Sequence, residues 1–431
     1  DEAALNLKLK QGAKGTWNGI LGIGGGYSPV MWEASMTPMM FGRKFQTILT
    51  YKMNNTGNDV SQPLKSQYAW AGNIPELISV ASPGTPPVDW RTWRRNNIQA
   101  VSANGILKID DDSDITAKVH YIHDIQCSSG ESHTEYIVQG MPSFSVEEKI
   151  GTEDKSHEME LNLQYRLNAT KRYVSNEITL MTEKRDDIGT VSKLGTEINQ
   201  KTDIPFFKLE NNLNCVKTLG STQVIFRSST SFTGRDSYLE VSPNLYADVL
   251  GIKDTIRQDI YSTKIYSNNN IVASHNIGRL ILGIGATGNI DIESFKSELA
   301  ASDSMRNNIQ WRRFDAKLSP SISYNIGKLA FDLSLPASYI VINSAGYPLF
   351  EPSLSVHFKV TQNLTFKASA RKGGTFSGLY ESYGGYVMTN YRNISSRGDK
   401  INRTTGANVI FDATYANALN AFFINGAASY T

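Results

Sequence analysis

The stretch that decides the fold is EMELNLQYRL, residues 158–167. Its odd-numbered residues, from Met159 to Leu167, are apolar or aromatic, and its even-numbered residues, from Glu158 to Arg166, are polar or charged. Because successive side chains of a β-strand point to opposite faces, this segment has one apolar face and one polar face. The same period of two recurs at 115–121, 224–226, 314–324, 328–335, 354–360, 364–368 and 409–415. Helical periodicity is scarce, so we predict an all-β chain.

The connections between these segments come in two sizes that take turns along the chain. The short connections are 42–44, 110–114, 168–170, 218–221, 325–328, 361–363 and 416–418. The long ones are 55–98, 125–156, 184–204, 234–254, 290–308 and 372–402. This alternation places all tight turns at one end of the strands and all large loops at the other, which is typical of outer-membrane barrels. A soluble β-sandwich also has alternating strands but no reason to segregate its loops, so we favour an antiparallel transmembrane β-barrel.

We count about seventeen strands, with boundaries uncertain by a few residues. They span 16–26, 30–41, 45–54, 99–109, 115–124, 157–167, 171–183, 205–217, 221–233, 255–277, 279–289, 309–324, 328–341, 350–360, 363–371, 404–415 and 419–430. Bacterial single-chain barrels normally have an even number of strands, and an open edge in lipid would leave backbone groups unsatisfied. We therefore expect further closing strands after Thr431. The alternative is that one strand was missed or merged.

One glycine motif points to a different fold. Residues 280–289, LILGIGATGN, contain Gly283, Gly285 and Gly288 in the G-x-G-x-x-G spacing of dinucleotide-binding loops. Such a loop must open a helix between parallel strands. Here Asn-Ile-Asp-Ile-Glu follows, and no amphipathic helix is predicted. We therefore interpret these glycines as structural residues of a strand.

Composition excludes several function classes. Lys and Arg number 43 and Asp and Glu 41, so the net charge of +2 gives no reason to expect a nucleic acid partner. No run approaches the ~18 apolar residues of a membrane-spanning helix. Cys127 and Cys215 are interpreted as two unrelated thiols, with a single disulfide as the alternative. His120 and His123 would face opposite sides of one strand and cannot share a metal ion. We predict no metal, no cofactor and, without an identifiable catalytic triad, no enzyme.

The beginning of the chain resembles a known family. DEAALNLKLKQGAKGTWNGILGIGGGY, residues 1–27, is similar to the junction of plug and barrel in TonB-dependent outer-membrane receptors. WEASMTPMMFGRKFQTILTYKMNNTGND, residues 32–59, resembles the first barrel hairpin of members with a carboxypeptidase-regulatory-like front domain. The resemblance implies a barrel of twenty-two strands around a plug that carries a TonB-binding segment. We expect 1–15 to be the junction from a plug outside this chain and 16–431 to be a barrel that is incomplete at its C-terminus.

Two aromatic segments are candidate ligand sites on the extracellular loops. In PPVDWRTWRRNN, residues 86–97, indole rings could stack on a sugar or another planar ligand while guanidinium groups bind carboxylate or phosphate. The candidates there are Trp90, Arg91, Trp93, Arg94 and Arg95. The segment 371–393 adds Tyr380, Tyr383 and Tyr386 for capture of carbohydrate or peptide, or for contact with a partner lipoprotein. The alternative is that these residues belong to the membrane-interface girdle or bind lipopolysaccharide phosphates.

Two functions follow from these observations. The first is a receptor in the outer membrane whose loops bind a nutrient and whose lumen passes it inward, with TonB as the partner of the expected plug. The second is a barrel that transports nothing and serves as scaffold or accessory subunit of a larger outer-membrane complex. The expected partners are outer-membrane lipids, lipopolysaccharide and other outer-membrane subunits.

Overall fold

The computed structural model describes residues 15–64, 72–137, 143–193, 195–251, 254–299, 305–398, 400–417 and 420–430. Nearly all of them form antiparallel strands, as the alternation of side chains predicts. The strands are β1 (Thr16–Gly26), β2 (Met31–Phe41), β3 (Phe45–Asn54), β4 (Arg95–Lys108), β5 (Ser113–Tyr136), β6 (Phe144–Ala169), β7 (Arg172–Lys193), β8 (Thr196–Leu219), β9 (Thr222–Ser242), β10 (Ile256–Ile277), β11 (Leu280–Leu299), β12 (Arg306–Ile326), β13 (Leu329–Ser334), β14 (Ala337–Ile342), β15 (Ala345–Phe350), β16 (Ser353–Lys359), β17 (Leu364–Phe376), β18 (Val387–Asn390), β19 (Asn393–Ser395), β20 (Arg403–Asn417) and β21 (Phe422–Tyr430). The short helices are α1 (Trp90–Trp93), α2 (Ala247–Leu250) and the 3-10 helix η2 (Leu379–Glu381).

The strands form one large sheet in which sequence neighbours pair with each other. Two strands of this sheet are interrupted at a proline: β13 and β14 both pair with β12 on either side of Pro336, and β15 and β16 flank Pro352. Proline has no N–H to donate to a ladder, which explains both breaks. The sheet has nineteen strands, so treating each interrupted pair as one strand gives seventeen among the described residues. The predicted strand count and order are confirmed. The remaining strands, β18 and β19, form a separate hairpin.

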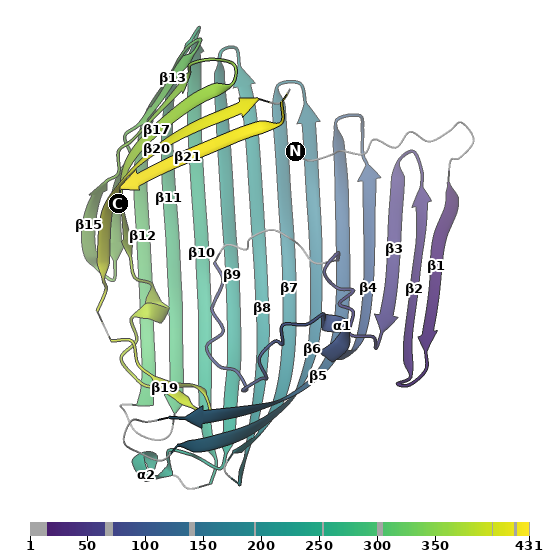
Figure 1. Ribbon diagram of the computed structural model, residues 1–431. Coiled ribbons are helices and arrows are strands. Elements are labelled where there is room, and N and C mark those ends of the chain that lie inside the picture. Colours follow the sequence, from purple (N-terminus) through teal and green to yellow (C-terminus); the bar gives the residue numbers. More distant parts are fainter. Residues whose placement is uncertain are drawn as a thin grey trace.

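The tight turns lie at one end of the sheet and the loops at the other (Figure 1). Several turns contain a glycine in the left-handed region, such as Gly220 at φ 63° and Gly278 at φ 62°, where a side chain would be strained. The predicted placement of short connections at one end is therefore correct, whereas the other end carries both long connections and tight turns, such as the one at Asn343 and Ser344 between β14 and β15. The end with the large connections is called the loop end below.

The predicted long loops 125–156, 184–204 and 290–308 are largely strand instead. Strands β5 to β12 have between 20 and 26 residues, about twice the length that a bilayer requires. The loop interpretation was wrong because strands were identified by an apolar outward face. Beyond the membrane the outward face of the same strands is polar. The wall of the sheet therefore extends well past the membrane at the loop end.

The two faces of each long strand exchange polarity along its length. In β8, outward residues near the tight turns are apolar, as at Phe207 and Leu209, and their inward neighbours are Lys208 and Glu210. Nearer the loop end the inward residues are Ile198 and Ile204, both buried, and the outward residues are Glu197, Asn199 and Lys201. An apolar outside with a polar inside suits lipid, whereas a polar outside with an apolar inside suits water.

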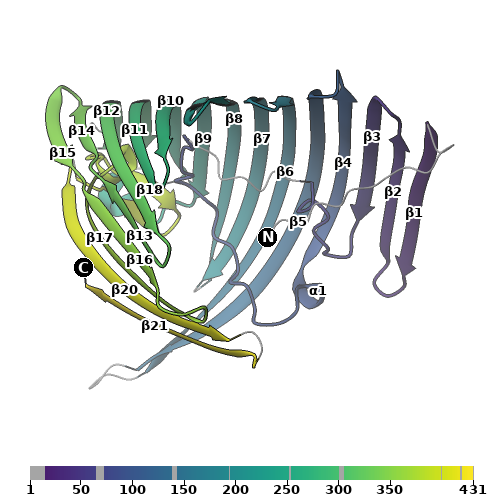
Figure 2. The ribbon, with the colours of Figure 1, turned by 90° about the horizontal axis from the view of Figure 1, so that it is seen from above.

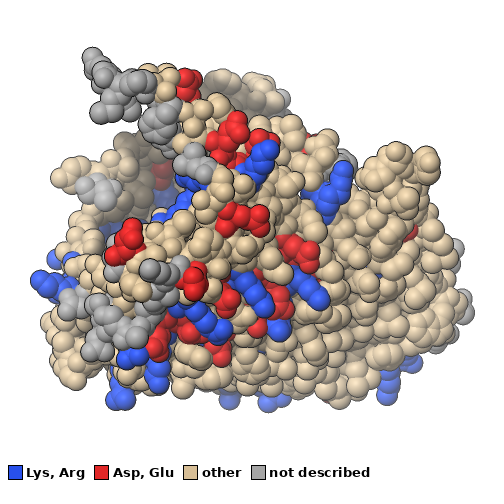
Figure 3. All heavy atoms as spheres, turned by 90° about the horizontal axis from the view of Figure 1, so that it is seen from below, with Lys and Arg blue, Asp and Glu red and all other residues tan. Residues whose placement is uncertain are grey.

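The exchange occurs at the same height on neighbouring strands. The first charged outward residues are Lys184 on β7 and Asp203 on β8, 3.8 Å apart, and Asp259 on β10, which binds Arg257 of the same strand at 2.9 Å. We call this row the charged belt. Seen from the loop end, acidic and basic side chains lie interspersed rather than in one field of a single sign (Figure 3). The belt marks the boundary of the apolar band on the side of the loop end.

The sheet curves strongly but does not close on itself within the described residues. Seen from above, it forms an open trough with β1 and β21 at its two edges (Figure 2). No described residue of β1 pairs with β21. Among the described residues, no helix is long and apolar enough to cross a membrane.

Candidate functional site

Two segments from the loop end fold into the trough and fill it beside the charged belt. One is 72–86, between β3 and β4, and the other is 377–398, between β17 and β20. They meet where Ser79 N donates to Thr389 O at 2.9 Å. We call the two segments together the luminal cap. Their buried side chains, including Ile78, Leu379 and Val387, pack against inward residues of β7 to β12, β14 and β15 in one apolar core.

The segment 72–86 is anchored to the wall by a charged contact. The carboxylate of Glu76 binds Arg185 of β7 through Oε1 and Arg235 of β9 through Oε2, the latter at 3.1 Å. Arg185 also binds Asp187 at 2.9 Å. These groups are partly withdrawn from water, so the charge-assisted hydrogen bonds are stronger than surface ion pairs. The anchor thus holds the segment across three neighbouring strands.

Further hydrogen bonds extend this anchorage along the same segment. Thr233 donates to Gly72 O at 3.0 Å, Lys208 Nζ donates to Asn73 Oδ1 at 3.1 Å, and Ala81 N donates to Gln200 Oε1 at 3.0 Å. Backbone groups buried away from water need such partners. The segment is therefore held at its beginning, middle and end.

The segment 377–398 is held by the opposite wall. Met388 N donates to Gln258 Oε1 at 2.9 Å, and Asn307 both accepts from and donates to the backbone of Gly385. A Cβ at Gly385 would collide with the backbone carbonyl of Arg306, so only glycine allows this approach. Tyr391 donates to Glu148 Oε1 at 2.5 Å and so reaches across to β6.

The cap leaves a pocket of about 440 Å³ between residues 82–86, Trp93 and the hairpin of β5 and β6. Its lining combines hydroxyl groups with three carboxylates, those of Glu131, Glu148 and Asp154. The buried Nε1–H of Trp93 has no hydrogen-bond partner among the described residues. A buried donor without a partner is costly unless water or a ligand accepts from it. This pocket is the candidate ligand site.

Burial raises the pKa of Asp154 to about 6, and the nearby Asp187 carboxylate adds to the increase while Arg185 opposes it. The two aspartates face each other across β6 and β7. Burial also raises the pKa of Asp187, again against the effect of Arg185. The pocket and the anchor of segment 72–86 therefore share one titrating pair, which lies on the loop-end side of the charged belt.

The structure places the predicted site residues in different surroundings. Trp90 and Arg91 belong to α1, and their side chains lie outside the described part of the chain. Trp93 lines the pocket. The charge of Arg94 acts on Asp59, whose pKa is lowered on balance by hydrogen bonds from Ser61 and Gln62 against the effect of burial. Arg95 is exposed and donates to the carbonyl of Arg94 at 3.2 Å.

The predicted tyrosines serve the cap. Tyr383 is only 1% exposed, and its ring lies 5.6 Å from that of Phe295, as does the ring of Tyr380. Both side chains are packed inside the trough rather than presented on an extracellular loop. Tyr386 is 43% exposed and remains a ligand-binding candidate. Figure 1 shows α1 beside β4 to β6 and β19 beneath β9 to β12, so the two predicted groups do not form one site.

Sequence reasoning missed Glu76, Arg185 and Arg235. Glu76 lies in a connection without periodicity, and the arginines lie on stretches interpreted wholly or partly as loops. Following the alternation of β7 and β9 past the apolar band would have placed both arginines on the inward face. Cys127 and Cys215 are both free, as expected for unrelated thiols. Among the described side chains, no three His, Cys, Asp or Glu residues are placed to hold a metal ion.

Comparison with known proteins gives structural neighbours only. No family model and no curated protein matches the sequence. The ferripyoverdine receptor of the outer membrane of Pseudomonas aeruginosa is 10% identical over 90% of this chain and 59% of its own, with a TM-score of 0.37. The ferric yersiniabactin uptake receptor FyuA from Yersinia pestis is 7% identical over 90% of this chain and 63% of its own, with a TM-score of 0.39.

This chain thus spans about three fifths of the length of those two receptors. The likeness is weak in both identity and TM-score, so the fold class rests on the strand registers and the side-chain pattern. The first of these neighbours is a receptor of the outer membrane and the second is an uptake receptor.

Proposed function

We propose that this chain is the barrel wall of an outer-membrane receptor that captures a small ligand at its loop end and passes it through the lumen. The observation that carries the proposal is the exchange of polarity along β6 to β12. Between the charged belt and the tight turns, the wall presents apolar side chains outward and hydrogen-bonded polar side chains inward. A lipid-embedded wall around a polar lumen requires this arrangement. On the loop-end side of the belt, the wall holds the luminal cap and the Trp93 pocket.

The pocket lining indicates the ligand class. Glu148 is paired with Arg392 and Glu131 with Lys149, while the described residues of the lining present hydroxyl groups and acidic side chains with no basic side chain among them. Such a lining disfavours an anionic ligand, and an indole ring beside it suits a polyhydroxylated or cationic one. The chain would then differ in ligand from the iron-complex receptors it resembles. Arg95 and Tyr386 remain candidates for contact with a ligand outside the pocket.

The free edges of β1 and β21 support the prediction of a larger barrel. An edge strand in lipid exposes backbone N–H and C=O groups that the bilayer cannot satisfy. We infer that further strands, and a plug with a TonB-binding segment, accompany this wall in the working receptor.

Binding of chosen probes to the full receptor tests the proposal. The probes are maltohexaose as a neutral polyhydroxylated molecule, spermidine as a cation and ferric citrate as an anion, and binding is followed by tryptophan fluorescence. We expect either of the first two to bind at least tenfold more tightly than ferric citrate, and Trp93→Ala to abolish the difference. Tighter binding of ferric citrate, unaffected by Trp93→Ala, would overturn the assignment of the pocket.

The second function, a scaffold in an outer-membrane complex, is favoured by a separate observation. The lipid-facing surface carries polar side chains at its centre, as described below. A barrel that transports nothing would still need that surface, so the two functions are not exclusive.

A further inference from the structure

We propose that a second copy of this chain docks, within the membrane, on the outward face of β8 to β12. The inference is independent of any transport function. It begins with polar residues in the middle of the apolar band. Asn211, Thr230 and Ser267 are direct cross-strand neighbours on β8, β9 and β10, and Ser228 pairs with Asn269 in the adjacent row. All of them lie at outward positions, which are the odd-numbered residues of β8 and β10 and the even-numbered residues of β9.

Apolar rows enclose this polar patch on both sides. Toward the charged belt the same strands carry Leu209, Phe232 and Ile265, and toward the tight turns they carry Cys215, Phe226 and Ile271. The patch therefore lies within the apolar band rather than at its rim. Polar side chains at this depth are costly against lipid and are typical of surfaces where membrane proteins associate.

The polar side chains bind one another. Ser228 Oγ donates to Asn269 Oδ1 at 2.7 Å, Asn269 Nδ2 donates to Ser267 Oγ at 3.0 Å, and Thr230 and Ser267 share a hydrogen bond of 2.9 Å. A primary amide offers two donor hydrogens and two acceptor lone pairs. These bonds use only part of the capacity of Asn269, so the amide is suited to bind a second polar group across an interface.

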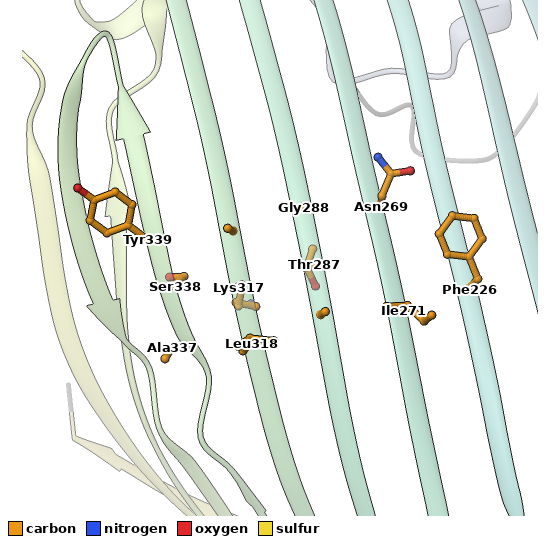
Figure 4. Close-up of a pocket in the computed structure, with 12 residues that line it drawn as sticks. Phe226, Asn269, Ile271, Thr287, Gly288, Lys317, Leu318, Ala337, Ser338 and Tyr339 are labelled. Atoms are coloured by element: carbon orange, nitrogen blue, oxygen red, sulfur yellow. The ribbon is translucent and has the colours of Figure 1, made fainter.

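Beside the patch, small residues leave a hollow of about 630 Å³ (Figure 4). Ala286, Gly288, Ala316 and Ala337 form its floor, and Figure 4 shows Phe226 at one end and Tyr339 at the other. A Cβ added at Gly288 would meet nothing within 4 Å. Small residues at a membrane interface allow close approach of a partner.

Symmetry selects a second copy as the occupant. Two copies inserted in the same direction are related by a two-fold axis along the membrane normal, which gives an isologous interface. With the axis at β10, β9 of one copy faces β11 of the other at the same height. Phe226 is level with Ala286 in the register of the sheet, so Phe226 of one copy faces this small floor residue of the other. The two Asn269 amides meet at the axis. A lipid acyl chain fills a hollow but offers no partner to the amide.

Cross-linking and filling of the hollow test the proposal on the full protein in native membranes, with Cys127 and Cys215 replaced by serine. Asn269→Cys should form a disulfide-linked dimer on oxidation, and Leu163→Cys, outward on β6 away from the patch, should not. Gly288→Leu should reduce the dimer fraction in mild detergent at least tenfold. Gly105→Leu, which adds the same bulk to the outward face of β4, should leave it unchanged.

Three results would overturn the proposal. The first is a monomer at every concentration, and the second is equal cross-linking at both cysteine positions. The third is loss of a bound lipid or of a different protein in Gly288→Leu without any change in self-association.

Discussion

At the scale of single residues, Glu76 shows how the lumen is filled. An unstructured connection would normally remain in solvent, yet this one lies in the trough, where Ile78 joins the apolar core and the Glu76 carboxylate binds two arginines on different strands. The same arginines would be costly without it, since they lie in a layer of the wall that the cap shields from water. Glu76 thereby determines where the cap lies.

Replacing Glu76 by Gln should loosen segment 72–86. The substitution keeps the size of the side chain but leaves Arg185 and Arg235 without their shared anion, and we expect the free energy of local opening to fall by about 1–3 kcal/mol. Hydrogen exchange of the backbone amides in 72–86 measures this quantity. Glu298→Gln, which removes an exposed pair with Arg306 away from this segment, should change it by less than about 0.5 kcal/mol. Equal effects would mean that the Glu76 contact does not anchor the cap.

Asp154 predicts a pH dependence with a defined sign. Its pKa is raised from 3.8 to about 6, so the folded protein binds the proton more tightly than the unfolded chain does. Stability contributed by the protonated form is then complete below pH 4 and is lost as the pH rises through 6. The melting temperature of Asp154→Asn, measured from pH 4 to 7, should show a clearly smaller decrease, and the remainder comes from Asp187, whose pKa burial also raises. Glu153→Gln on the opposite face should retain it, and an unchanged profile in Asp154→Asn would contradict the assignment.

At the scale of elements, the strands could be predicted from sequence but their lengths could not. Alternation in residues such as Met159 to Leu167 identifies a strand because lipid demands an apolar outward face over that length. Beyond the charged belt, water replaces lipid outside, and the inward residues become apolar, as at Ile198 and Ile204 of β8. A prediction that looks for the same apolar face along the whole strand therefore assigns the part beyond the charged belt to a loop. The Trp93 pocket depends on contacts between distant segments, which no local pattern contains.

The location of the apolar band can be tested on one pair of adjacent residues. Leu163 is outward on β6 and pairs with Ile178, near the middle of the band, while Gln164 faces the lumen and donates to Ser175. Leu163→Arg should reduce the free energy of unfolding by about 2–4 kcal/mol. Gln164→Arg should reduce it by less than about 1 kcal/mol, because water reaches the lumen face. Denaturant titration in lipid vesicles measures both values, and comparable losses would exclude a lipid-facing β6.

At the scale of the whole molecule, the wall combines two solvents in one sheet. The half with the tight turns has an apolar outward face, as a membrane protein has. The half at the loop end has a polar outward face and an apolar inward face, as a water-soluble protein has, and the luminal cap covers that apolar inward face. The cap therefore has two consequences: it stabilises the extended wall, and it obstructs the lumen. A receptor that passes its ligand inward must displace at least one of the two cap segments.

Locking the two cap segments together separates capture from passage. The backbone hydrogen bond between Ser79 and Thr389 brings these residues close enough for a disulfide after Ser79→Cys and Thr389→Cys, again with Cys127 and Cys215 replaced by serine. The oxidised protein should bind its probe at the Trp93 pocket within about twofold of the reduced protein, because the pocket is already formed. Uptake of the same probe by cells should fall at least tenfold and return on reduction, whereas either single cysteine variant should import normally. Undiminished uptake by the oxidised protein would show that the cap does not lie on the path of the ligand.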